Sequence, residues 1–191
     1  MIKGDYLNLT KGQLKSKDGI DLYSRKDFDG MHTAGRVAAE ILDEIVTSVF
    51  PGQTTGKIDS IIEELIRDKN VESGTIGYRG YQHASCISVN HVVCHGIPSD
   101  KILKERDILN IDVTVIKDGW YGDTSRMYVA GQPSRKAERL IQVTHDALFK
   151  GIDAVKPGKT FGDIGHAIQT YVEANRMSVV RDFCGHGLGR V

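Results

Sequence analysis

Two aspartates and one histidine are the residues of this chain whose types and spacing favour metal chemistry. Asp112 and Asp123 lie in the two arms of a predicted β-hairpin, and His186 follows in the glycine-flanked turn CGHGLGR. Carboxylate and imidazole groups bind divalent ions such as Mn, Fe, Co and Zn, and three protein ligands leave an ion open to substrate. The three residues therefore predict a hydrolytic metal site.

The hairpin that must position the aspartates follows from the sequence DILNIDVTVIKDGWYGDTSRMYVAG. Asp118-Gly119 between two apolar runs is a strong signal for a two-residue hairpin loop. With that loop, Thr114 faces Asp123, and Asp112 lies two residues from Thr114 on the same face of the sheet. The two carboxylates are then diagonal neighbours that can share one cation.

The shared face also makes an energetic demand on the two aspartates. Two ionised carboxylates without partners in a half-buried sheet cost several kcal/mol, so we expect a cation or raised pKa values there. A three-residue loop or a bulge would place them on opposite faces. The alternative interpretation is that both are ordinary exposed aspartates at strand ends.

The composition of the 191 residues is that of an ordinary globular protein, with 40% hydrophobic and 26% charged residues. Lysine plus arginine and aspartate plus glutamate number 25 each, so no net charge attracts nucleic acid or an acidic membrane. The three cysteines show no CxxC spacing, and the N-terminus has no apolar signal-peptide core. We therefore expect a cytoplasmic protein that binds neither DNA nor membranes.

Helical periodicity separates two groups of helices, one before the hairpin and one after it. The predicted helices cover residues 24–50, residues 57–70, residues 134–155 and a segment that begins at Thr160. Strands are expected around ASCISVNHVVCHG and again after the last helix. The polar residues 1–23 are interpreted as a loosely held N-terminal arm.

The second group of helices is interpreted as a copy of the first. VFPGQTTGKIDSIIEEL, from Val49, and VKPGKTFGDIGHAIQTY, from Val155, align at an offset of 106 residues. Helix-start chemistry alone would explain the shared Pro-Gly and Thr, but an internal duplication explains all the matches. A second hairpin would then end near residue 237, about 46 residues beyond Val191. The chain is therefore expected to be a fragment of a longer protein.

Four further residues are candidates for substrate contact. His95 precedes a rigid Gly-Ile-Pro turn at a predicted strand end, where it could donate a proton or simply bond to backbone carbonyls. Tyr78, Tyr81 and Cys86 could line an apolar pocket or belong to the core. No GxSxG, P-loop or HExxH motif is present, so serine hydrolases, P-loop NTPases and zincins lack support.

The segments SVNHVVCHGIP, NIDVTVIKDGWYGDTSRMYVAG and SVVRDFCGHGLGR, in that order and spacing, strongly resemble the type I methionine aminopeptidases. The resemblance covers nearly everything from about Asp27 to Val191. It implies the α+β pita-bread fold, with two pseudo-symmetric halves of antiparallel sheet and flanking helices. Residues 24–191 would form this catalytic domain, with its second half truncated.

The resemblance also implies roles for the candidate residues. Asp112, Asp123 and His186 match metal ligands, and Asp123 would bridge two divalent ions, which would be Co, Mn, Fe or Zn. His95 matches a catalytic histidine that contacts substrate, and Tyr78, Tyr81 and Cys86 match positions around a methionine pocket. The family completes its centre with two glutamates and another histidine after the CGHG turn, so this chain is expected to bind metal weakly and to have little activity.

The implied function is removal of the initiator methionine from nascent chains by a monomeric, cytoplasmic metallo-exopeptidase, with the ribosome as a further partner. Two alternatives stay open. One is a non-catalytic pita-bread binding module that has lost its metals. The other is a related aminopeptidase or dipeptidase that acts on Xaa-Pro bonds, which the absence of a large extra N-terminal domain disfavours.

Overall fold

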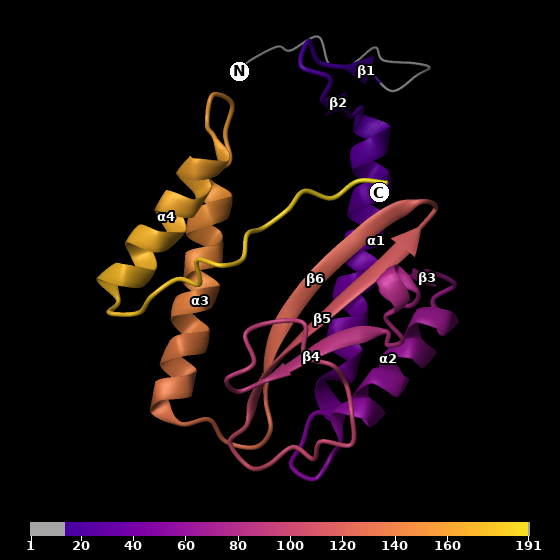
Figure 1. The fold of residues 1–191 in the computed structure, drawn as a ribbon. Coiled ribbons are helices and arrows are strands. Elements are labelled where there is room, and N and C mark those ends of the chain that lie inside the picture. The colour runs from indigo at the N-terminus through magenta and orange to yellow at the C-terminus, as the bar shows by residue number, and fades with distance from the viewer. Residues whose placement is uncertain (1–13, 191) are drawn as a thin grey trace.

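The computed structural model describes residues 14–190, in which one antiparallel sheet packs against a pair of helices and a second helix pair stands to one side (Figure 1). The helices are α1 (Arg25–Glu44), α2 (Thr55–Asp68), α3 (Arg135–Ala154) and α4 (Phe161–Ala174), with the 3-10 turns η1 (Ile45–Ser48) and η2 (Tyr78–Gly80). The strands are β1 (Leu14–Lys15), β2 (Asp21–Leu22), β3 (Glu72–Ser73), β4 (Ser85–Val89), β5 (Ile108–Lys117) and β6 (Trp120–Val129).

The sheet is built around β5, which pairs with β6 along one edge and with β4 and β3 along the other. Asp118 and Gly119 both have positive φ, 52° and 77°, as a two-residue hairpin turn requires. Lys117 consequently pairs with Trp120, and the register continues without a bulge to Ile108 and Val129. The predicted hairpin is confirmed.

All four helices form where the periodicity predicts them, and their starts follow local capping rules. Asp27 Oδ2 accepts a hydrogen bond of 2.8 Å from Ser24 N at the start of α1. Thr54 and Thr160 accept hydrogen bonds from the backbone at the starts of α2 and α4. The starts of α2 and α4 thus correspond at the offset of 106 residues, and both helices contain 14 residues.

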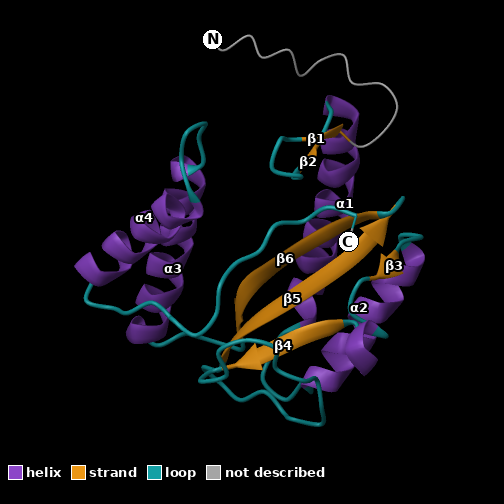
Figure 2. Cartoon of the chain, turned by 45° about the horizontal axis from the view of Figure 1, so that its top comes forward, coloured by secondary structure: helices purple, strands orange, loops and turns teal. Residues whose placement is uncertain are grey.

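The core lies between the sheet and the first helix pair. One face of β5 is fully buried and consists of Leu109, Ile111, Val113 and Val115. It packs against apolar side chains from α1, α2 and η1, which are Ala38, Ile41, Leu42, Ile45, Ile58 and Ile62. Figure 2 shows both helices on the same side of the sheet, so the opposite face of β5 is left for polar side chains.

Three expectations about extended structure differ from what the structure shows. Residues 14–22, within the expected arm, form a small hairpin of β1 and β2, and residues 1–13 lie outside the described residues. Strand β4 ends at Val89, because Asn90 and His95 have positive φ and the chain turns back. No strand follows α4 up to residue 190. No helix between residues 14 and 190 is long and apolar enough to cross a membrane.

Candidate metal centre

The β5–β6 register places the two aspartates as the sequence predicts. Thr114 pairs with Asp123 and Asp112 pairs with Ser125, so both carboxylates project from the face of the sheet that lies away from α1. Thr114 Oγ1 donates a hydrogen bond of 3.1 Å to Asp123 Oδ1. This bond fixes one oxygen of Asp123, a function for Thr114 that the period-2 pattern alone did not reveal.

The electrostatics of the pair show two carboxyl groups that influence each other. Burial, followed by the negative charge of the adjacent Asp123 carboxylate, raises the pKa of Asp112 to about 6. His186 acts in the opposite sense because a protonated ring would favour the ionised carboxylate. Two half-buried carboxyl groups that repel each other require a proton or a cation between them.

His186 approaches this pair through Nε2, which lies 3.6 Å from Asp123 Oδ2. Its other nitrogen, Nδ1, lies 3.0 Å from the carbonyl oxygen of Gly187. Since a carbonyl oxygen only accepts, Nδ1 is the donor in this contact, and Nε2 is the ring atom that faces Asp123. An imidazole nitrogen beside a carboxylate is a pair of donors that could share a bound ion, with the backbone bond orienting the ring.

The donor chemistry therefore fits a divalent ion, although the three groups do not yet surround one point. Between residues 14 and 190, no three His, Cys, Asp or Glu side chains lie close enough together to hold one ion. The side chain of His186 is 68% exposed, whereas that of Asp123 is 21% exposed. The two carboxylates therefore share one half-buried face of the sheet, and the exposed imidazole lies beside Asp123.

Tyr81 and Cys86 lie on one side of the carboxylates and contact each other. Cys86 pairs with Asp112 across the β4–β5 ladder, so its thiol lies on the same face as the carboxyl. Tyr81 Oη donates a hydrogen bond of 2.8 Å to Ser85 O, and Cys86 Sγ lies 3.6 Å from the same Oη. Burial raises the pKa of both groups, so they form a neutral wall beside Asp112.

Tyr78 and His95 are more exposed than the sequence suggests. Tyr78 is 63% exposed in η2, with the Arg79 guanidinium 5.4 Å from its ring centre. His95 lies in the loop after β4, and its ring meets Phe183 edge-on with centroids 6.3 Å apart. Phe183 belongs to the same segment as His186, so the contact of His95 is with the segment that follows α4.

A buried network next to the wall escaped the sequence analysis. Asp59 accepts hydrogen bonds from Ser85 N at 2.9 Å and Ser85 Oγ at 2.7 Å, and its other oxygen lies 3.0 Å from His83 Nδ1. The side chain of Asp59 is only 9% exposed. A carboxylate between Ile58 and Ile62 on the buried face of α2 is the signal that could have revealed it.

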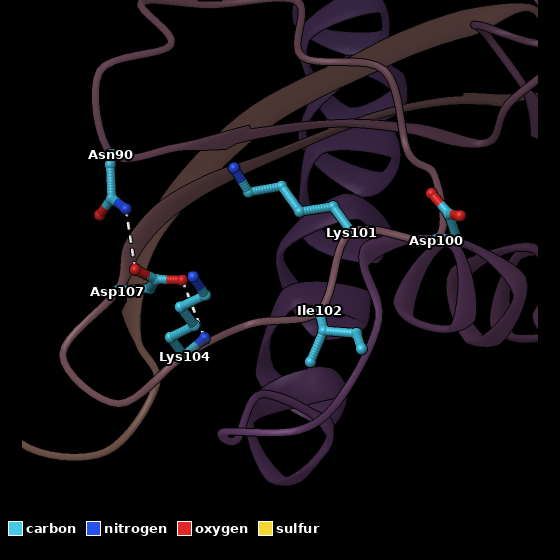
Figure 3. Close-up of a pocket in the computed structure, with 6 residues that line it drawn as sticks. All are labelled: Asn90, Asp100, Lys101, Ile102, Lys104 and Asp107. Carbon is cyan, nitrogen blue, oxygen red and sulfur yellow. Dashed lines mark hydrogen bonds between the residues drawn. The ribbon is translucent and has the colours of Figure 1, made fainter.

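A surface pocket of about 410 Å³ lies away from these residues, in the connection between β4 and β5 (Figure 3). Its lining residues are Asn90, Asp100, Lys101, Ile102, Lys104 and Asp107. Asp107 accepts hydrogen bonds from Asn90 Nδ2 and Lys104 N, so its carboxylate holds the loop together. None of the predicted site residues lines this pocket.

Comparisons with known proteins identify the family of the chain. The profile of metallopeptidase family M24 matches residues 29–191. Methionine aminopeptidase of Rickettsia prowazekii is 54% identical over 172 residues, and that of Escherichia coli K12 is 49% identical over 173 residues. Each alignment covers 90% of this chain and 66% of the relative, so the chain spans just under two thirds of their length.

Solved structures give the same result. The crystal structure of the Rickettsia prowazekii enzyme superposes with a TM-score of 0.87 over 89% of this chain and 68% of that one. Prolidase of Pyrococcus furiosus, at 18% identity, superposes with a TM-score of 0.72 over 81% of this chain and 44% of that one, which shows a shared fold alone. These likenesses confirm the predicted pita-bread α+β fold, and the chain belongs to metallopeptidase family M24.

Proposed function

We propose that the protein is a metal-dependent aminopeptidase that removes the initiator methionine from nascent chains with a small second residue. The observation that carries the proposal is the placement of Asp112 and Asp123 on one face of the β5–β6 hairpin, with Nε2 of His186 3.6 Å from Asp123 Oδ2. The likeness to two proteins named methionine aminopeptidase supports the substrate. We place the enzyme in the cytoplasm as a monomer, with the ribosome as partner and no role for DNA or membranes.

The cofactor in this proposal is a pair of divalent ions, which would be Co, Mn, Fe or Zn. Asp112, Asp123 and His186 would hold them, with Asp123 shared, because mixed carboxylate and imidazole donors suit these metals better than calcium. When bound, such ions activate water and polarise a carbonyl group. The raised pKa of Asp112, about 6, means that protons compete with the ions below that pH.

The substrate groups are assigned from the surfaces that surround the carboxylates. Tyr81 and Cys86 would contact the methionine side chain, since a neutral ring edge and a thiol suit a thioether. Tyr78 would complete this pocket from η2, which requires its exposed ring to turn inward. His95 would donate a hydrogen bond to the substrate amide from the loop after β4.

Turnover of the peptide Met-Ala-Ser by the full-length protein tests the proposal. Asp123→Asn should lower kcat/KM more than about 100-fold. Substitution of residues that only hydrogen-bond to metal ligands already lowers metal affinity or activity roughly 10-fold to 100-fold. Lys101→Met, in the separate pocket of Figure 3, is the control and should keep full activity. Unchanged turnover in Asp123→Asn would contradict the metal role.

The same preparation distinguishes the two alternatives. A protein that retains no metal after dialysis and cleaves no peptide would be a binding module. Hydrolysis of Ala-Pro in preference to Met-Ala-Ser would assign the protein to the Xaa-Pro enzymes, whose fold it shares.

A further inference from the structure

The segment that carries His186 is attached to the sheet at its far end only. After α4 the chain crosses from the second helix pair to the tip of the β5–β6 hairpin (Figure 1). Residues 181–187 are all exposed, whereas Leu188 is half-buried and Gly189 is buried. The contact that fixes this segment therefore begins three residues after the histidine.

Gly189 makes the backbone part of the contact. Its carbonyl oxygen accepts a hydrogen bond of 3.0 Å from Tyr121 N, on the edge of β6 that faces away from β5. A Cβ at Gly189 would lie 2.8 Å from the hydroxyl oxygen of Tyr23, so a larger residue here would displace the Tyr23 side chain. Tyr121 is two residues from Asp123 on one face of β6, so this bond is made next to the metal centre.

Arg190 makes the side-chain part of the contact. Its guanidinium carbon lies 4.1 Å from the ring centre of Trp120, and its Nη1 donates a hydrogen bond of 3.2 Å to Asp118 O. Trp120 is 4% exposed, and the ring of Tyr23 meets it edge-on at 5.7 Å. A planar guanidinium over a buried indole gives a more favourable interaction free energy than an exposed ion pair does. We call Arg190, Trp120 and Tyr23 the anchor.

The anchor limits where His186 can go. His186 lies three positions before Gly189, and an extended chain spans about 3.5 Å per residue, so the Cα of His186 stays within roughly 10 Å of Gly189. Among residues 14–190, the imidazole hydrogen-bonds only to the carbonyl of its neighbour Gly187. Its place 3.6 Å from Asp123 thus depends on the anchor rather than on contacts of its own.

We infer that Arg190 and Trp120 are positioning residues that hold His186 beside Asp123, so that docking of Arg190 and binding of a divalent ion favour each other. The inference rests on the proposed metal centre. Because coupling between two binding events is reciprocal, the ion should tighten the anchor by the same factor by which the anchor tightens the ion. For a cation–π contact on a buried ring we expect a factor of about ten.

Calorimetric titration of the metal-free 191-residue chain with Mn²⁺ measures one direction of this coupling. Arg190→Met should weaken Mn²⁺ binding about tenfold, and Arg190→Lys should recover part of the loss because an ammonium group also binds the ring. Arg181→Met is the matched control, since Arg181 lies in the same segment but pairs with Glu173 at 3.4 Å, away from the anchor. It should bind Mn²⁺ as the unmodified chain does.

Fluorescence measures the other direction, because Trp120 is the only tryptophan of the chain. Mn²⁺ should reduce the quenching of Trp120 by acrylamide in the unmodified chain and in Arg181→Met. It should have no such effect in His186→Ala, which lacks the third donor, or in Arg190→Met, which lacks the anchor. Urea unfolding without metal should remain a single cooperative transition in all Arg variants, with a small shift of the midpoint in Arg190→Met, which loses its contact with Trp120.

The outcomes separate this inference from the proposed function. No Mn²⁺ binding by the unmodified chain would contradict the metal centre and the inference with it. Binding by the unmodified chain that Arg190→Met leaves unchanged would overturn the inference alone. A loss of Mn²⁺ affinity accompanied by loss of the cooperative unfolding transition without metal would also overturn it, because the variant would then be unfolded before any metal is added.

Discussion

The two helix pairs of this protein have the same lengths but very different surroundings. Helices α1 and α3 contain 20 residues each, and α2 and α4 contain 14 each. The first pair packs on the sheet and buries its apolar stripe in the core. The second pair packs mainly on itself and buries only Val143, Ala147, Gly151 and Val172. The amphipathic pattern therefore determines where a helix forms. A neighbouring sheet determines whether the apolar face of that helix is buried.

The exposed side chains of the second pair make the same point. Leu148, Phe149 and Ile152 of α3 are all more than half exposed, and Phe161 at the start of α4 is 89% exposed. At the offset of 106 residues the counterpart of Leu148 is Leu42, which is fully buried, and that of Phe161 is Thr55, which is also buried. Stability should therefore be concentrated in the first pair, and the predictions below measure that difference.

The largest effect is expected from equivalent isoleucines of α2 and α4. Ile62 is fully buried, so Ile62→Ala should lower the free energy of unfolding by about 3 kcal/mol. Ile168, which lies 106 residues later and packs against Gly151 of α3, is half-buried. Ile168→Ala should cost about 1 kcal/mol or less, because its site can collapse. If urea unfolding showed the same decrease in the free energy of unfolding for both variants, the two helix pairs would be equally stabilised by their neighbours.

The second largest effect concerns Asp59, whose counterpart at the same offset is Gly165. Asp59→Ala leaves Ser85 N, Ser85 Oγ and the His83 ring without their acceptor. We therefore expect the free energy of unfolding to fall by about 2–3 kcal/mol. Glu63→Ala on the exposed side of α2 is the control and should stay within about 0.5 kcal/mol. Thermal unfolding measures both variants, and a loss as small as that of the control would refute the proposed importance of the network.

Much of the fold could be predicted because local rules determine it. The Asp118-Gly119 loop sets the register of the β5–β6 hairpin, and the register sets the face on which Asp112 and Asp123 meet. Helix starts at Ser24 and Thr160 follow from short-range capping. These features need only residues a few positions apart.

The remainder depends on contacts between distant residues. The strand expected to continue to Gly96 ends at Val89, because Asn90 adopts a positive φ. The residues around Asn90 do not predict this conformation. The position of His186 depends on Arg190 reaching Trp120, some 70 residues earlier in the chain. The buried partners of Asp59 lie more than 20 residues away in β4 and before it. Periodicity carries no information about such pairs.

A smaller effect is expected from the threonines that cap α2 and α4. Thr54→Ala and Thr160→Ala each remove an acceptor for a backbone N–H, at a cost of about 1 kcal/mol. Since α2 is locked into the core, Thr54→Ala should accelerate amide hydrogen exchange throughout the sheet and the first helix pair. Thr160→Ala should accelerate exchange in α3 and α4 alone. Equal acceleration everywhere in either variant would indicate that both pairs unfold as one unit.

The smallest effect is a pH dependence at the starts of α1 and α4. The backbone N–H and hydroxyl of Thr160 lower the pKa of Asp163, and the hydroxyl and backbone N–H of Ser24 lower that of Asp27. Each carboxylate therefore stabilises the folded state above its ordinary pKa of 3.8, and this contribution is lost as the pH falls through the lowered value.

Carboxyl carbon shifts in NMR titrations should give midpoints below 3.8 for both aspartates. In Thr160→Ala only the midpoint of Asp163 should return towards the ordinary value, because the hydroxyl that donates to it is gone. Acid should then fray α4 without disturbing the sheet, whereas protonation of Asp27 should loosen α1 against its core. Simultaneous fraying of both helices at one pH would show that the second pair draws its stability from the first.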